Sequence, residues 1–135
     1  MLYEGKVENR SKVPEEQRKR VLIVDDETAI RETFAMLCSH YGHDADTAAD
    51  GVEGLAMYKK GGYDLILTDN NMPVMGGWEM MEEIKQNGNG VPVVLLSGRP
   101  IDPGEAKAQG FIHYEPKPVM MSRVHELIEQ YAKKD

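Results

Sequence analysis

Short apolar runs alternate along this chain with longer stretches whose apolar residues recur at helical spacing. Residues 21–24, 65–67 and 93–96 are apolar, too short for helices and bounded by polar or turn-forming residues, so they predict buried strands. Residues 45–49 are more polar and predict a weaker strand at a sheet edge. Residues 110–114 predict a fifth strand.

The intervals between the strands have the pattern of helices that pack on a core. We expect a first helix ended by Gly42 and a second that starts at the N-cap Asp50 and ends at Gly61. The residues predicted to face the core in the first, second, third and last helices are Ile30, Phe34, Leu37, Cys38 and Tyr41; Val52, Leu55 and Ala56; Trp78, Met81 and Ile84; and Met120, Val124, Leu127, Ile128 and Tyr131.

The fourth helix is expected to be short or irregular. The stretch between Ser97 and Gly110 contains two prolines and a glycine. Asp102 as N-cap and Pro103 at the first helical position allow about two turns. Five alternations of strand and helix predict an α/β fold, a flavodoxin-like doubly wound sheet of five parallel strands in the order 2-1-3-4-5 with five helices. We assign residues 20–135 to this domain and residues 1–19 to a flexible leader.

Polar residues follow four of the predicted strands. Asp25 and Asp26 follow the first, Asp69 the third, Ser97 the fourth and Lys117 the fifth. The carboxyl ends of parallel strands share one sheet edge, so these groups are expected to converge there. Each residue alone is as well explained by a turn, a helix start or a solvated loop. Together, three carboxylates, a hydroxyl and an ammonium predict a metal-assisted phosphate site.

With these blocks in this order, the chain resembles the receiver domain of a two-component response regulator from about Arg20 to Tyr131. The resemblance implies that Asp69 is the phosphoacceptor and that Lys117 and Ser97 contact the phosphoryl oxygens. It implies Mg²⁺ bound by Asp26, Asp69 and the backbone carbonyl of Asn71, with Asp25 acting through water.

The resemblance also implies a switch made of Ser97 and Tyr114, and a cis peptide bond between Lys117 and Pro118. Asn71 and Arg99 occupy positions that tune the lifetime of the phosphorylated state in that family.

By the same resemblance, the chain takes a phosphoryl group from a sensor histidine kinase or a histidine phosphotransfer protein and signals to a downstream effector protein. It would catalyse its own phosphorylation and dephosphorylation without being a turnover enzyme. A receiver-like binding module that works without phosphorylation is the main alternative. A phosphatase with an aspartyl nucleophile is disfavoured because Asn71 stands where a second acid is usual.

Charge and composition narrow the function further. The net charge is −7, and residues 21–135 alone carry −9, which argues against nucleic-acid binding by the domain. No stretch is long and apolar enough to span a bilayer, and the single cysteine, Cys38, fits a reducing compartment. We therefore expect a cytoplasmic protein without membrane contact, either a monomer or a weak phosphorylation-dependent dimer.

Overall fold

Five parallel strands form one sheet in the order β2-β1-β3-β4-β5. The structure, a computed structural model, describes residues 13–88 and 90–134. The strands are β1 (Arg20–Val24), β2 (Asp44–Ala48), β3 (Leu65–Asp69), β4 (Val93–Ser97) and β5 (His113–Pro116). The predicted strand order and the polar edge position of the second strand are confirmed.

The register places the carboxyl ends of the central strands side by side. Val24 in β1 pairs with Thr68 in β3, and Asp69 pairs with Leu96 in β4. At the other side of β4, Ser97 pairs with Pro116, one residue before Lys117. The residues that follow β1, β3, β4 and β5 therefore share one edge, as the strand pattern predicts.

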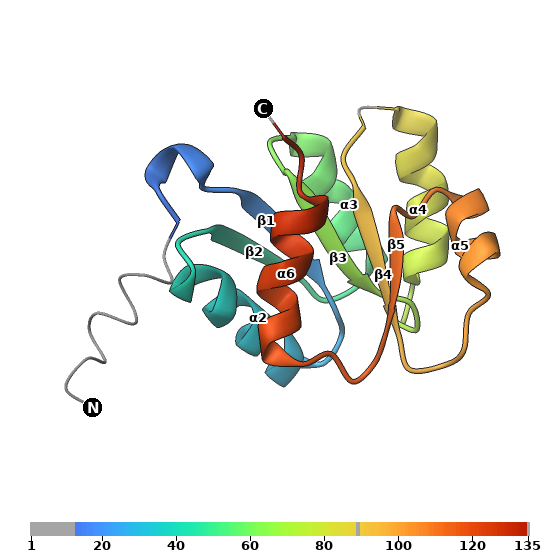
Figure 1. Cartoon of the computed structure of the whole chain (residues 1–135). Coiled ribbons are helices and arrows are strands. Elements are labelled where there is room, and N and C mark those ends of the chain that lie inside the picture. Colours follow the sequence, from blue (N-terminus) through green and yellow to red (C-terminus); the bar gives the residue numbers. More distant parts are fainter. Residues whose placement is uncertain (1–12, 89, 135) are drawn as a thin grey trace.

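Helices cover both faces of the sheet (Figure 1). α2 (Thr28–His40) and α6 (Met121–Tyr131) lie on one face, and α3 (Gly51–Lys60), α4 (Gly77–Asn87) and α5 (Pro103–Gln109) lie on the other. Alternate residues of β1 point to the two cores, since Ile23 packs with α2 and α6 whereas Leu22 packs with α3 and α4. Burial on both faces explains why β1, β3 and β4 are continuous apolar runs.

The predicted faces of two helices are partly wrong. In α3, Val52 and Ala56 are exposed, whereas Gly51, Gly54 and Tyr58 are buried. A Cβ at Gly54 would lie 3.0 Å from a methyl of Val24, so α3 approaches the sheet through its glycines rather than through its branched side chains. In α6, Met120 is the residue before the helix and is 70% exposed, although Val124, Leu127 and Ile128 are buried as predicted.

The prediction of a short fourth helix is confirmed. α5 has seven residues, with Pro103 in its first turn. The Asp102 carboxylate accepts a hydrogen bond from the Glu105 amide at 2.9 Å, as expected for an N-cap.

The end of the predicted leader lies against the domain. Residues 13–19 include a 3₁₀ turn, η1 (Glu15–Gln17). The Val13 amide donates to the Tyr41 carbonyl, and the Lys19 amide donates to Nδ1 of His43, each at 3.0 Å. Residues 1–12 of that leader lie outside the described residues. Within the described part of the chain, no helix has the length and apolar character needed to cross a membrane.

Candidate functional site

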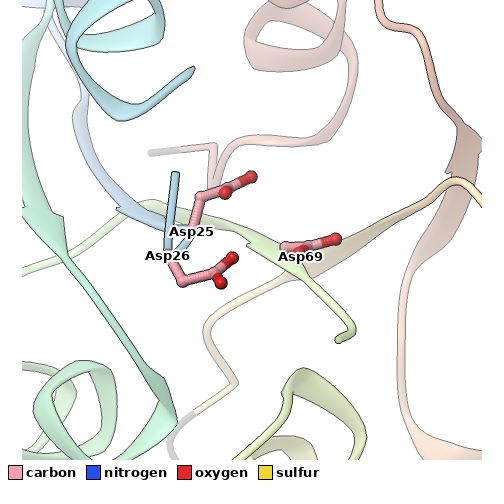
Figure 2. Close-up of side chains that lie close together, drawn as sticks. All are labelled: Asp25, Asp26 and Asp69. Atoms are coloured by element: carbon pink, nitrogen blue, oxygen red, sulfur yellow. The ribbon is translucent and has the colours of Figure 1, made fainter. Parts of the chain in front are cut away.

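Three carboxylates meet at the carboxyl edge of the sheet (Figure 2). Asp25 and Asp26 directly follow β1, and Asp69 is the last residue of β3. One oxygen from each carboxylate lies within 4.8 Å of the other two. Asp25 and Asp69 are 1% and 8% exposed, whereas Asp26 is open to solvent. Like charges this close in a largely buried site must be offset by a cation.

Lys117 supplies part of that counter-charge. Its Nζ lies 3.1 Å from Oδ2 of Asp25 and 3.2 Å from Oδ1 of Asp69, and it arrives from the loop after β5. Burial alone would lower the pKa of Lys117, but the hydrogen bond and charge of Asp25, together with those of Asp69, outweigh burial and raise it. The ammonium therefore stays charged. The peptide bond between Lys117 and Pro118 is cis, as the resemblance implies.

The carboxylate of Asp69 is less easily ionised than an ordinary aspartate. Burial raises its pKa, and the negative charge of Asp25 adds to the rise, while Lys117 acts in the opposite direction. The Lys117 ammonium therefore does not offset the combined effect of burial and of the Asp25 charge on the pKa of Asp69. A divalent cation would complete the balance.

The residues present fit a magnesium ion. The ligands on offer are carboxylate oxygens, which hard cations such as Mg²⁺ prefer, and the exposed side of Asp26 leaves room for bound water. Asn71 is exposed in the loop after β3. The role of its backbone carbonyl as a magnesium ligand stays a prediction.

The loop after β3 is shaped by close backbone packing. The Gly77 amide donates to the Asn70 carbonyl at 3.0 Å, and a Cβ on Gly77 would collide with the Asp69 carbonyl. Between them, Val74 has φ 69° and is 81% exposed. A β-branched residue in the left-handed region is strained, so this loop stores strain beside the acid cluster.

Ser97 lies at the same edge, but its hydroxyl forms hydrogen bonds with the backbone of Arg99. Ser97 is 1% exposed; its Oγ donates to the Arg99 carbonyl at 3.0 Å and accepts from the Arg99 amide at 3.1 Å. The hydroxyl of the half-buried Tyr114 donates to the same Arg99 carbonyl at 3.3 Å. The two predicted switch residues are therefore linked through one carbonyl oxygen, a connection that no sequence pattern reveals.

One further residue touches this site without having been predicted. Arg31 in α2 donates from Nη1 to the backbone carbonyl of Asp25 at 2.7 Å. Arg31 lies six residues after Asp25 and one turn into a helix, and this position could have suggested the contact. A charged residue in a helix, however, most often faces solvent.

Comparison with known proteins agrees with the fold and identifies a family. The family model described as the response regulator receiver domain matches residues 21–129. A response regulator receiver protein of Anaeromyxobacter sp. (strain Fw109-5) is 32% identical over 111 residues, covering 81% of this chain and 47% of that protein. The chain thus spans about half the length, or less, of the curated relatives it matches.

Solved structures lead to the same family. A CheY-like response regulator receiver domain protein from Methanospirillum hungatei JF-1 superimposes with a TM-score of 0.78 at 30% identity, covering 84% of this chain and 92% of that one. The chemotaxis protein CheY4 of Vibrio cholerae gives 0.78 at 29% identity, covering 84% and 98%. The chain therefore belongs to the response regulator receiver domain family of two-component signalling.

Proposed function

We propose that this domain takes a phosphoryl group from phosphohistidine onto Asp69 and passes the signal on by a conformational change. The observation that supports the proposal most directly is the Lys117 ammonium between Asp25 and Asp69, at the edge where three carboxylates meet. An enzyme-like site with this composition can hold a transferring phosphoryl group by charge and position.

In the proposed reaction, an oxygen of the Asp69 carboxylate forms a bond to phosphorus while the phosphorus–nitrogen bond of phosphohistidine breaks. The electron pair of that bond returns to the imidazole, and Asp69 becomes an acyl phosphate. Asp26, Asp69 and the Asn71 carbonyl would hold Mg²⁺, with Asp25 reaching it through water. When bound, Mg²⁺ supplies positive charge to a phosphoryl oxygen.

Lys117 and Ser97 would stabilise the remaining phosphoryl oxygens. Lys117 already lies within contact of Asp69, so its ammonium can follow the added group as a compact point charge. Ser97 would turn its hydroxyl from the Arg99 carbonyl toward the phosphoryl group.

That rotation offers a route for the signal. The Arg99 carbonyl now accepts hydrogen bonds from both Ser97 and Tyr114. If Ser97 leaves this carbonyl, the loop holding Arg99 is freed to move, and the Tyr114 ring can change its position against α5. The changed surface would be recognised by an effector protein.

We further propose a cytoplasmic setting, a sensor histidine kinase or histidine phosphotransfer protein as donor, and a monomer or weak phosphorylation-dependent dimer as the assembly. The acidic domain is proposed to bind neither nucleic acid nor membrane. The domain would promote its own phosphorylation and hydrolysis without acting as a turnover enzyme.

Intact-protein mass spectrometry tests this function. Incubation with phosphoramidate and Mg²⁺ should add the mass of one phosphoryl group, and Asp69→Asn should remove the addition. Glu83→Gln, a change at an exposed acid in the second half of α4, is the control and should be labelled like the wild type. Absence of labelling in the wild type would favour a binding module that works without phosphorylation.

A further inference from the structure

Arg31 is bound to the peptide unit that joins two of the acids. Its Nη1 donates to the Asp25 carbonyl at 2.7 Å, and its Nη2 lies 3.3 Å from the Thr28 hydroxyl within the same helix turn. The Asp25 carbonyl belongs to the peptide bond between Asp25 and Asp26. A charged donor at 2.7 Å makes a strong hydrogen bond to a neutral acceptor.

The three carboxylates differ in how their side chains are held. Asp25 accepts from the Glu27 amide at 2.9 Å and from Lys117 at 3.1 Å. Asp69 contacts Lys117. For Asp26, the described residues supply no side-chain hydrogen bond or ion pair. Its direction is therefore set by the backbone that carries it.

We propose that Arg31 is a positioning residue for the magnesium site. By holding the Asp25–Asp26 peptide unit, it directs the exposed Asp26 carboxylate toward Asp69, so that a cation meets both ligands without reorganising the loop. The inference rests on the proposed function, because it assumes that the acid cluster binds Mg²⁺. Groups that orient metal ligands from outside commonly change metal affinity by about 10–100-fold.

The structure also provides a way to separate position from charge. Arg31 is a cation close to the acids, so as a mere charge it opposes Mg²⁺ binding, and its removal would strengthen binding. As an anchor for the peptide unit, its removal would weaken binding. The two roles predict opposite signs for the same substitution.

The test compares Arg31→Gln and Arg31→Lys with the wild-type chain by isothermal titration calorimetry with MgCl₂, without a phosphodonor. Gln removes the charge, and Lys keeps it but loses the planar fork that reaches both acceptors. Lys59→Gln, which removes an exposed positive charge in α3, is the matched control. Urea unfolding in EDTA shows that each variant is folded under the titration conditions.

We expect the Kd for Mg²⁺ to rise about 10-fold for Arg31→Gln and by a smaller factor for Arg31→Lys, with Lys59→Gln close to wild type. Equal or tighter binding by Arg31→Gln would overturn the positioning role while leaving the proposed function in place. Absence of Mg²⁺ binding by the wild-type chain would overturn both. A purely structural role for Arg31 would lower stability in EDTA without changing the Kd of the folded protein, and it would also overturn the inference.

Discussion

Replacing Lys117 by Met should make the metal-free domain markedly less stable. The substitution keeps an unbranched chain of similar length and removes the ammonium that contacts Asp25 and Asp69. Two largely buried carboxylates are then left facing each other, with Asp26 nearby.

The distances set the size of the effect. At 3.1 and 3.2 Å, each contact is a Coulomb attraction of about 5 kcal/mol at an effective dielectric constant of about 20. The substitution also removes the desolvation cost of the partly buried Lys117 ammonium, and this offsets part of the lost attraction. Breaking a buried ion pair by removing one partner typically costs about 3–5 kcal/mol, and we expect a loss of about 3 kcal/mol in the free energy of unfolding at pH 7.

The effect should depend on pH in a defined direction. Burial already raises the pKa of Asp69, and removing Lys117 raises it further. The folded state then holds a proton that the unfolded state releases above its ordinary pKa of 3.8, so the stability of the variant falls as the pH rises through the folded pKa of Asp69. The deficit relative to wild type is therefore expected to shrink on acidification.

Urea unfolding followed by the fluorescence of Trp78 measures this deficit in EDTA between pH 5 and 8, and again with Mg²⁺. Mg²⁺ should reduce the deficit because it neutralises the same carboxylates. Lys85→Met, which removes a half-exposed lysine that pairs with Glu82 in α4, is the control and should cost at most about 1 kcal/mol. A Lys117→Met deficit below about 1 kcal/mol in EDTA, unchanged by pH, would refute the reasoning.

Three further substitutions test separate features. Val74→Gly should raise the free energy of unfolding by about 1 kcal/mol, measured by urea unfolding, because φ 69° is strained for Val and the exposed side chain loses little packing. Gly77→Ala should lower the free energy of unfolding by about 1–3 kcal/mol, because the added Cβ collides with the Asp69 carbonyl. An unchanged urea midpoint would contradict this, since it would mean that the loop moves to accept the Cβ at no cost. Burial and the nearby His125 lower the pKa of His43 below 6.5, so wild-type stability should fall as the pH drops below 6.5. His43→Gln should flatten that slope in thermal melts, whereas the exposed His40→Gln should not.

The strand pattern predicted the architecture because three strands are buried on both faces. A short apolar run such as Val21–Val24 indicates a buried strand, and the polar residues after each run indicate the sheet edge that the strands share. Convergence of Asp25, Asp26, Asp69 and Lys117 was predicted from the strand order. The structure places the three carboxylates within 4.8 Å of one another and brings Lys117 into contact with Asp25 and Asp69.

The helix faces could not be predicted as well, because apolar character does not report how closely two elements approach. Val52 was expected inside since it is apolar, yet α3 packs through Gly51 and Gly54, which carry no hydrophobic signal. Met120 follows the helical spacing of α6 but lies before its first turn. In both cases tertiary packing, rather than periodicity, decides burial.

The hydrogen bonds that link side chains within the site go to backbone carbonyls, and these bonds could not be predicted from the sequence either. The Arg99 carbonyl links Ser97 to Tyr114, and the Asp25 carbonyl binds Arg31. Every residue has a carbonyl, so a sequence gives no signal for which one accepts a particular side chain.

The most direct test of the central claim is to locate the phosphoryl group. Borohydride reduces an aspartyl phosphate to homoserine, so the protein treated with phosphoramidate and Mg²⁺ and then reduced can be digested and read by tandem mass spectrometry. We expect homoserine at position 69, with Asp25 and Asp26 unmodified. Homoserine at either of those two positions, or at none, would contradict the central claim.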